Sequence, residues 1–298
     1  MKNSPILQRI TILIIFTFIS CKQDNELSKK VNSFYDEVYY ENLHPNKKTH
    51  YLDSIFQLVN KQPNDSITRY EILTLSCAYY YLNEPKLSKS VAEKALTLAS
   101  ESNDSLCMGK AYYYMGDAYD NSKRDSAYYY YLKAEKIYEV LDNKDWIAQM
   151  KFNKAYMLFF SGNYSECEVE LSKALHLLQN TLNYRLRYNC LNLLGNCLEK
   201  SEEYDEANKY HLMALDEIEL LKKSDVFKDK SKASSISTTI NLCNLHDIRG
   251  EYDLSITKLK PLLSNEIRIE FPYEYSVMTG NLANAYMKSG NLKTALPL

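Results

Sequence analysis

The chain has 298 residues, of which 45% are hydrophobic and 25% are charged, an ordinary balance for a globular protein. The formal net charge is -2, and no stripe of lysine and arginine could neutralise several phosphates, so we do not expect this segment to bind nucleic acid. No alternating β-branched run is long enough for a sheet, and no proline lies between Lys86 and Lys260. These features predict an all-α fold.

The first twenty residues have the pattern of an export signal. Lys2 and Arg9 precede an apolar run of ten residues at positions 10–19. Ten residues are too few to span a bilayer as a helix, but they fit the central segment of a secretory signal peptide. We predict a signal peptide at residues 1–20 and a polar tether at residues 21–30.

The motif Phe18-Ile19-Ser20-Cys21 resembles the lipobox of bacterial lipoproteins. The resemblance implies that Cys21 is acylated and anchors the protein in the bacterial cell envelope. Lys22 stands where an aspartate would, in that family, favour retention in the inner membrane, so the resemblance favours the outer membrane. An uncleaved N-terminal anchor or an ordinary signal peptide is the alternative to this hypothesis.

Residues 31–64 contain two amphipathic patterns that differ from the rest of the chain. Their apolar positions are Val31, Phe34, Tyr35 and Val38 in the first, and Leu52, Ile55, Phe56 and Val59 in the second. We predict a pair of helices that caps the first open face of the helical array that follows.

Residues 66–298 are organised by a repeated spacing. Small or apolar residues recur at intervals of 39, 40, 40 and 48 residues, and a second series lies seven positions earlier in each unit. The first series is Ala95, Ala134, Ala174, Ala214 and Leu262, and the second is Ser88, Ala127, Cys167, Ala207 and Ser255. Such a period indicates a solenoid whose units must stack because none can bury a core alone. We predict about six repeats, with the last one truncated.

Each repeat is predicted to contain two helices joined by a short turn. Glycines 162, 250 and 290 fall at these turns, where glycine can adopt the left-handed conformation that ends a helix. Gly116 and Gly195 are expected where paired helices approach most closely. The helical periodicity is clearest between Cys190 and Leu215.

This pattern closely resembles the tetratricopeptide repeat. The matching residues in the clearest unit are Leu194, Gly195, Leu198, Tyr204, Ala207 and Ala214. The asparagine-containing motifs at 241–244 and 281–286 look like the kinesin-light-chain style of the repeat. The resemblance covers residues 68–298. It implies a right-handed α-solenoid that binds a protein or an extended peptide in its concave groove, and it does not indicate which ligand.

No catalytic or metal-binding motif is present. None of the five histidines pairs with another at i, i+4, and the nucleophile-elbow, dinucleotide-binding and phosphate-loop motifs are missing. We therefore predict a non-enzymatic protein without a metal or a cofactor.

Seven cysteines raise the question of disulfides in an exported chain. Cys190 and Cys197 lie seven residues apart on one predicted helix, about 10 Å along its axis, which is too far to bridge. Cys167 and Cys243 occupy small-residue packing positions. The pattern favours buried cysteines that act as small hydrophobic side chains, and it leaves open a bridge between adjacent repeats.

Two sets of residues on first helices are candidates for ligand contacts, because first helices line the inner surface of such a solenoid. The first set is an apolar patch in the third repeat, with an adjoining tyrosine: Phe152, Tyr156, Phe159, Phe160 and Tyr113. The alternative is that aromatic side chains fill the space between repeats while tyrosine hydroxyls reach water or backbone.

The second set consists of paired asparagines in the last three repeats. The pairs are Asn192 and Asn196, Asn241 and Asn244, and Asn281 and Asn284. Spacings of three or four residues put both members of a pair on one helical face. Because an amide both donates and accepts, a row of them could pair with the backbone of an extended peptide, as groove asparagines do in related tetratricopeptide proteins. An equally supported alternative is that they bond to neighbouring helices or to water.

Two functions are compatible with these patterns. One is a membrane-anchored scaffold that binds a protein or peptide, which the acylatable Cys21 favours. The other is the extracytoplasmic sensor region of a truncated signalling protein with a histidine-kinase or helix-turn-helix output module. The repeat that stops at Leu298 favours the second function. We expect the chain to be a fragment of a longer protein, and the alternative is an interrupted reading frame.

Overall fold

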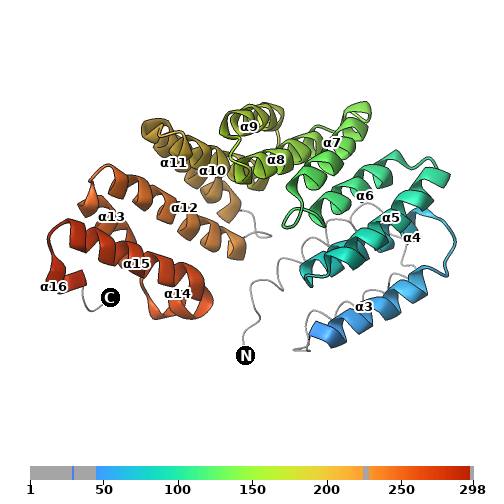
Figure 1. Ribbon diagram of the computed structural model, residues 1–298, viewed down its shortest axis with the longest axis horizontal. Helices are drawn as coiled ribbons and strands as arrows, with labels where there is room; N and C mark the ends of the chain where they lie inside the picture. The colour runs from blue at the N-terminus through green and yellow to red at the C-terminus, as the bar shows by residue number, and fades with distance from the viewer. Residues whose placement is uncertain (1–28, 30–44, 224–227, 296–298) are drawn as a thin grey trace. The chain divides into compact units, whose positions relative to one another are not determined.

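The computed structural model describes Lys29, residues 45–223 and residues 228–295. All regular secondary structure in these ranges is helical, which confirms the predicted all-α fold (Figure 1). The predicted signal peptide, Cys21, the tether apart from Lys29, the first helix of the predicted cap and the last three residues lie outside the described ranges. Within those ranges, no helix has both the length and the apolar character needed to cross a membrane.

The chain divides into two compact units, Met1–Gly162 and Asn163–Leu298. The helices described in the first unit are α3 (Pro45–Val59), α4 (Ser66–Tyr81), α5 (Pro85–Glu101), α6 (Ser105–Asp117), α7 (Arg124–Val140) and α8 (Lys144–Phe160). Those in the second are α9 (Tyr164–Leu178), α10 (Tyr184–Lys200), α11 (Tyr204–Lys222), α12 (Lys228–Ile248), α13 (Tyr252–Leu259), the 3₁₀ turn η1 (Lys260–Leu262), α14 (Asn265–Glu270), α15 (Pro272–Lys288) and α16 (Leu292–Ala295).

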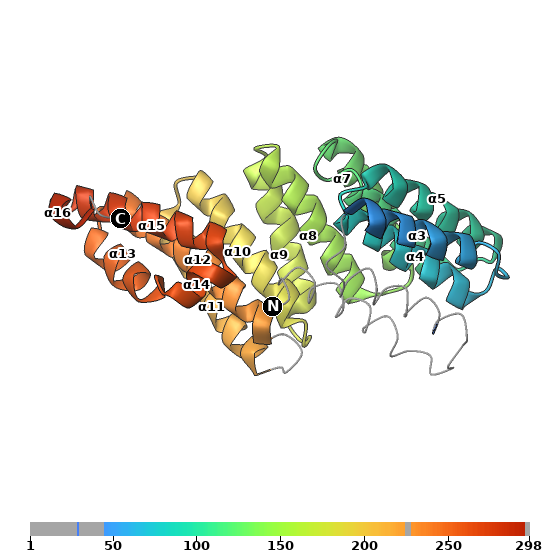
Figure 2. The ribbon, with the colours of Figure 1, turned by 90° about the horizontal axis from the view of Figure 1, so that it is seen from below.

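Helices that follow one another along the chain pack side by side within each unit, α3 to α8 in the first and α9 to α13 in the second (Figures 1 and 2). Both predicted series of small residues lie inside this packing. The fully buried members are Ala95, Ala134, Ala174 and Ala214 in the first series, and Ser88, Ala127, Cys167, Ala207 and Ser255 in the second. Small side chains at these points allow neighbouring helices to lie close together.

The remaining member of the first series does not fit the pattern. Leu262 is predicted at the packing position of a second helix, but it lies half-buried in η1. The preceding helix, α13, ends at Leu259 because Pro261 has no N–H for the next helical hydrogen bond. Leu262 still packs, partly buried, against the apolar cluster formed by α12, α13 and α15. The predicted place of Leu262 on the second helix is therefore wrong.

The turns between paired helices follow the predicted glycine rule. Gly162, Gly250 and Gly290 have φ values of 79°, 77° and 84°, which confirms their left-handed conformation. Polar residues adopt positive φ at four other connections, two between the helices of one repeat (83 and 202) and two between successive repeats (103 and 142). These residues are Asn83, Asn103, Asp142 and Glu202.

The predicted close approach at two other glycines is also confirmed. A Cβ atom added to Gly116 would lie 2.4 Å from the ring of Tyr131, and one added to Gly195 would lie 2.6 Å from the ring of His211. In both cases the ring belongs to the helix that follows, so the glycine makes room for a side chain of its own helical pair.

The second helix of the predicted N-terminal cap is α3. Leu52, Ile55 and Val59 on this helix are fully buried in one cluster with apolar residues of α4 and α5. The hydroxyl of Tyr79 on α4 donates to Asp53 Oδ1 on α3 at 2.6 Å. The described part of the predicted cap therefore covers α4 by both apolar and polar contacts.

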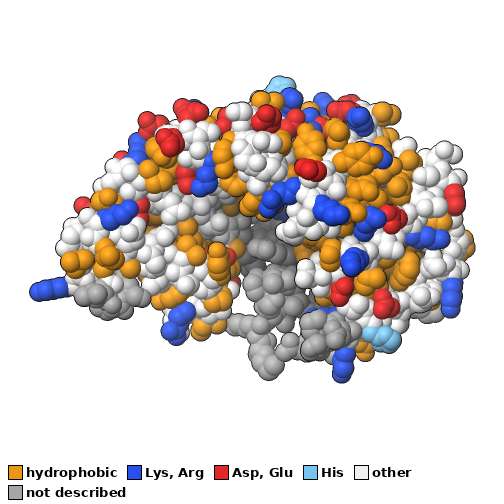
Figure 3. All heavy atoms as spheres, in the orientation of Figure 1, with side chains coloured by type: hydrophobic (Ala, Val, Ile, Leu, Met, Phe, Trp, Pro, Cys, Tyr) orange, Lys and Arg blue, Asp and Glu red, His pale blue; other side chains and the backbone are white. Residues whose placement is uncertain are grey.

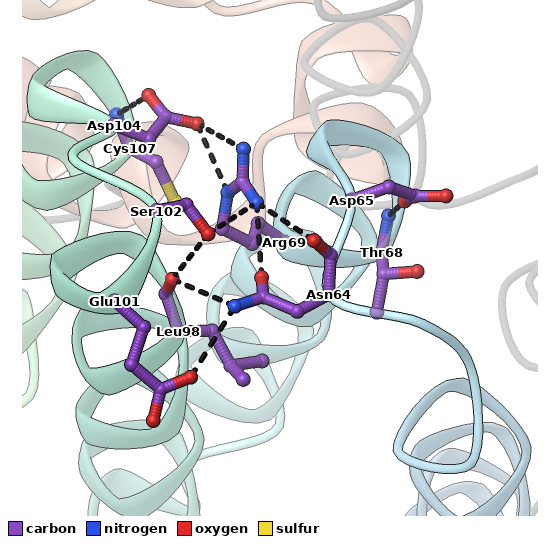
Figure 4. A network of polar contacts seen from close by, with 9 residues as sticks. All are labelled: Asn64, Asp65, Thr68, Arg69, Leu98, Glu101, Ser102, Asp104 and Cys107. Carbon is purple, nitrogen blue, oxygen red and sulfur yellow. Dashed lines mark hydrogen bonds and ion pairs between the residues drawn. The ribbon is translucent and has the colours of Figure 1, made fainter.

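A polar network joins the start of α4 to the connection between α5 and α6 (Figure 4). Arg69 is only 7% exposed. Its guanidinium Nε donates to Asp104 Oδ2 at 3.0 Å, and Nη1 donates to Asn64 Oδ1 at 2.9 Å and to Ser102 Oγ at 3.1 Å. Because Asp104 also accepts a hydrogen bond from the N-terminal turn of α6, Arg69 fixes one first helix relative to the next.

Candidate functional site

Asparagine side chains connect the first helices of the second unit, where α10 contacts α12 and α12 contacts α15. Asn241 Nδ2 on α12 donates to Asn196 Oδ1 at 3.0 Å and to Asn192 Oδ1 at 3.3 Å, both on α10. Asn281 Nδ2 on α15 donates to Asn244 Oδ1 on α12 at 2.7 Å. All five side chains are half-buried. We call these five residues the asparagine row.

Several polar atoms of the asparagine row have no hydrogen-bond partner among the described residues. They include Nδ2 of Asn196 and Asn244, and Oδ1 of Asn241 and Asn281. The sixth predicted asparagine, Asn284, is exposed on α15 and has no partner among the described residues. The structure therefore joins five of the six candidates by hydrogen bonds between helices, in one group of three and one pair, and leaves several of their polar atoms without a partner among the described residues.

A buried histidine supports the start of the row. His211 on α11 is fully buried, and its Nδ1 lies 3.2 Å from Asn192 Oδ1. Burial lowers the pKa of His211 from 6.5 to about 4, so the ring is neutral near pH 7. Thr238 Oγ1 on α12 also donates to Asn192 Oδ1, at 3.3 Å. Asn192, on α10, is thus contacted by polar side chains of two neighbouring helices, α11 and α12.

The predicted aromatic patch lies in the first unit, on α8. The rings of Phe152 and Tyr156 are 6.3 Å apart, and those of Tyr156 and Phe160 are 4.7 Å apart. Tyr156 is 41% exposed and Phe160 is 48% exposed, so these side chains form an accessible apolar stripe. The guanidinium carbon of Arg124 lies 5.6 Å from the Phe160 ring, close enough for a cation–π interaction.

Tyr113 does not join this stripe. Its ring lies 4.9 Å from that of Tyr114, 6.3 Å from that of Tyr131 and 5.5 Å from that of Trp146. Among the described residues it has no ring contact with Phe152. The expectation that Tyr113 adjoins the patch is therefore wrong, because its half-buried ring fills space between helices instead.

Sequence reasoning missed a buried carboxyl group beside Tyr113. Tyr131 Oη donates to Asp117 Oδ1 at 2.8 Å, and Tyr80 Oη donates to the nearby Asp120 Oδ2 at 2.7 Å. Burial, with a smaller contribution from Asp120, raises the pKa of Asp117 from 3.8 to about 7. Asp117 follows Gly116 as Asn196 follows Gly195, and this shared repeat position is the signal that could have identified it.

A second feature absent from the predicted sites is a group of surface tyrosines on α7 and in the connection between α6 and α7. Tyr130 stacks on Tyr119 with 5.7 Å between ring centroids, and Tyr129, which is 50% exposed, contacts Tyr130 at 5.3 Å. The ammonium of Lys133 lies 4.7 Å from the Tyr129 ring centroid. Figure 3 shows hydrophobic side chains gathered over these two helices. The run of tyrosines at 128–131 covers too much of the helix for all of them to be buried.

These faces offer hydrogen bonds, apolar rings and one buried carboxyl group. No group of three or more metal-binding side chains occurs in the described ranges.

Sequence comparisons find no matching protein-family model and no similar curated protein. Solved structures, in contrast, match over most of the chain. The apo form of RapI has a TM-score of 0.66 with 14% identity, over 97% of this chain and 80% of that one. The complex of NprR with its cognate peptide NprX has a TM-score of 0.56 with 14% identity, over 98% of this chain and 81% of that one.

A third match has a tetratricopeptide repeat sensor. It is the signal transduction ATPase PH0952 from Pyrococcus horikoshii, with a TM-score of 0.68 and 13% identity, over 97% of this chain and 43% of that one. At these identities the likeness concerns the fold. Together with the buried small-residue series and the glycine contacts, it shows that the chain is a helical-repeat solenoid with the fold of tetratricopeptide-repeat proteins.

Proposed function

We propose that the chain is a protein- or peptide-binding scaffold, and that its asparagine row holds the backbone of an extended peptide. The observation that supports this role is the set of unused amide groups, Nδ2 of Asn196 and Asn244 and Oδ1 of Asn241 and Asn281. A peptide backbone presents one acceptor and one donor per residue. The unused groups are complementary to both, and this role requires no catalysis.

The spacing of the helices is compatible with such a ligand. Packed helices lie about 8–10 Å apart, and an extended peptide advances about 3.3 Å per residue. Amides on successive first helices would therefore meet about every third residue of a bound peptide. Because these contacts involve the backbone, we expect the asparagine row to contribute affinity with little dependence on peptide sequence.

The comparisons support the proposal at the level of fold. NprR, which has the same kind of helical array, has been solved in complex with its cognate peptide. In the first unit of this chain, the exposed rings of Tyr156 and Phe160 offer a separate contact for apolar side chains of a partner.

The test begins with a pooled library of fluorescein-labelled, unstructured dodecapeptides and isolation of the binders by the full chain carrying Cys21→Ser. The triple variant Asn196→Ala, Asn244→Ala, Asn281→Ala should then lose about a hundredfold in affinity for those binders, because each lost hydrogen bond costs about 1 kcal/mol. Binders with N-methylated backbone amides should also bind poorly, whereas scrambled sequences should keep most of the affinity.

Asn208→Ala is the matched control, because Asn208 is half-buried on α11 and outside the asparagine row. It should leave affinity unchanged, and circular dichroism should show equal helicity in all variants. The proposal is wrong if no peptide binds, or if the triple variant binds as tightly as the parent.

We also propose that the protein is exported and anchored in the cell envelope, with the outer membrane favoured, through acylation of Cys21. The motif at 18–21 supports this location. Expression with radiolabelled palmitate should label the parent and not Cys21→Ser, and the parent should partition into the detergent phase of Triton X-114. A soluble, unlabelled parent would exclude the lipid anchor and leave the peptide-binding proposal untouched.

The alternative proposal is an extracytoplasmic sensor region of a longer signalling protein. The tetratricopeptide repeat sensor of the PH0952 ATPase supports it, since a similar array there is part of a larger protein. Sequencing the gene beyond codon 298 distinguishes the two proposals. A downstream run of about twenty apolar residues followed by an output domain would support the sensor.

A further inference from the structure

The contact between α9 and α10 brings together two cysteines that are distant in sequence. Sγ of Cys197 on α10 lies 2.9 Å from Sγ of Cys167 on α9, and both residues are fully buried. Both are free thiols in this structure. A disulfide bond is about 2.05 Å long, so an approach of about 1 Å would join the two sulfur atoms.

Helix packing does not by itself require sulfur at either position. The position of Cys167 is occupied in other repeats by serine or alanine, as at Ala127 and Ala207, and these residues are fully buried too. The position of Cys197 corresponds to that of Ala78 and Ala285, which are also buried. Small side chains of either kind satisfy the packing, so the facing pair of thiols needs another explanation.

A third cysteine near the pair provides a comparison. Cys190 on α10 is buried, and proximity to Cys167 adds to the burial that raises the pKa of its thiol. Only Cys197 has its sulfur in contact with that of Cys167 in the described part of the chain. Because Cys190 and Cys197 are about 10 Å apart along the helix, the two cannot bridge to each other.

We propose that Cys167 and Cys197 form a modification site, at which a low-molecular-weight or protein disulfide oxidises the two thiols to an intrachain disulfide that joins α9 to α10. This inference is independent of the proposed peptide binding.

The reaction balances as a thiol–disulfide exchange. The thiolate of one cysteine attacks a sulfur of the oxidant, forms a mixed disulfide and releases the first oxidant thiolate. The thiolate of the other cysteine then attacks the protein sulfur of that mixed disulfide and releases the second oxidant thiolate. Two electrons pass to the oxidant, whose S–S bond is replaced by two thiols, and the two protons lost by the protein are taken up by those thiolates.

The surroundings of the pair determine the expected rate and effect. The hydrogen bond to Cys167 and burial both raise the pKa of Cys197, and a buried thiol is out of reach of an oxidant. Oxidation should therefore wait for local opening between α9 and α10. Once formed, the bond should stabilise the fold because it restricts the unfolded chain between residues 167 and 197.

The test uses the full chain carrying Cys21→Ser, incubated with glutathione disulfide and then alkylated. Intact mass spectrometry should show the loss of two hydrogen atoms, and peptide mapping should recover a peptide pair linked through Cys167 and Cys197. Cys190→Ala should form the same link. Cys167→Ala and Cys197→Ala should form none, and both should fold because alanine occupies the same positions in other repeats.

A second measurement tests the structural effect of the bond. Oxidised parent and Cys190→Ala should melt on the order of 5 °C higher than their reduced forms. Neither Cys167→Ala nor Cys197→Ala should change on oxidation. The proposal is overturned if the parent keeps all its alkylatable thiols, if the recovered link contains Cys190, or if oxidised and reduced parent melt at the same temperature.

Discussion

The two units use the same glycine-to-ring contact with different polar partners. In the first, Gly116 makes room for Tyr131, whose hydroxyl donates to the carboxyl group of Asp117. In the second, Gly195 makes room for His211, whose ring lies within hydrogen-bond distance of an asparagine amide. The glycine fulfils the steric requirement in both, and the polar group that satisfies the ring differs. Packing of these paired helices therefore requires glycine at this position, whereas the polar residue that contacts the ring differs between the two repeats.

The difference matters for the ligand each unit could hold. Burial raises the pKa of the Asp117 carboxyl group, beside tyrosines in the first unit, from 3.8 to about 7, so its charge changes around neutral pH. The asparagine row in the second unit is neutral at every pH and presents donors and acceptors together. If the proposed function is correct, we expect the second unit to contact the peptide backbone and the first unit to contact apolar side chains.

The largest predicted effect on stability concerns two arginines in the first turns of helices, each of which forms an ion pair with a carboxylate on another part of its unit. Arg69 and Arg187 are each the fourth residue of a first helix, and each is paired with a carboxylate, that of Asp104 and of Glu217 respectively. Replacing either arginine by alanine should lower the free energy of unfolding by about 3 kcal/mol, because a largely buried carboxylate is left without its partner. Urea denaturation measures the change.

The exposed Arg268 provides the control, and Arg268→Ala should change stability by less than about 0.5 kcal/mol. If one arginine variant loses little free energy of unfolding and the other loses much, the ion pairs of Arg69 and Arg187 do not contribute equally to the stability of their own units.

The next effect concerns the shared glycine contact. Gly116→Ala and Gly195→Ala should each destabilise by about 1–3 kcal/mol, since the new Cβ would overlap a ring. Gly280 on α15 has no atom within 4 Å of the position of an added Cβ. Gly280→Ala should therefore be stabilising by up to about 1 kcal/mol, because alanine favours the helix. Equal behaviour of all three variants in thermal unfolding would contradict the packing role.

The two units should also respond to pH in opposite directions. The pKa of Asp117 is raised from 3.8 to about 7 in the folded state, so its contribution to stability is present below pH 3.8 and is lost as the pH rises through 7. The pKa of His211 is lowered from 6.5 to about 4, so its contribution is present above pH 6.5 and is lost as the pH falls through 4.

Two variants separate these contributions. Asp117→Asn should become more stable than the parent as the pH rises, by on the order of 2 kcal/mol near pH 8. His211→Phe should lose its disadvantage relative to the parent as the pH falls toward about 4. Urea midpoints of each variant and of the parent across the pH range give the two differences. Differences that do not depend on pH would exclude the assigned titrations.

The smallest effect concerns the asparagine row itself. Asn241→Ala removes the donor to Asn192 and Asn196 and should destabilise by about 0.5–1 kcal/mol. Asn208→Ala should be neutral or slightly stabilising, because alanine has the higher helix propensity. If both variants unfold at the same urea concentration, the hydrogen bonds of the row contribute no stability, and a role in ligand binding gains support.

The part of the candidate site that sequence predicted is the part that follows from position in the repeat. Asn192 and Asn196, for example, must share a helical face because they are four residues apart. Sequence left open whether these amides face a ligand or another helix, because the answer depends on how α10 and α12 are rotated against each other. Asp117 was missed for a different reason, because its equivalence to Asn196, the residue after the close-contact glycine, shows its place in the repeat but not its burial or its tyrosine partners.

The sequence by itself determined the helical class, the repeat length, the buried small residues and the left-handed glycine turns, because each follows from local periodicity and backbone preference. Only the tertiary structure decided that Asn241 reaches Asn196, that Cys167 meets Cys197 and that Tyr113 contacts Trp146. A shift of one residue turns a side chain by about 100° around its helix. Contacts between distant helices therefore depend on their relative rotation, which no local pattern encodes.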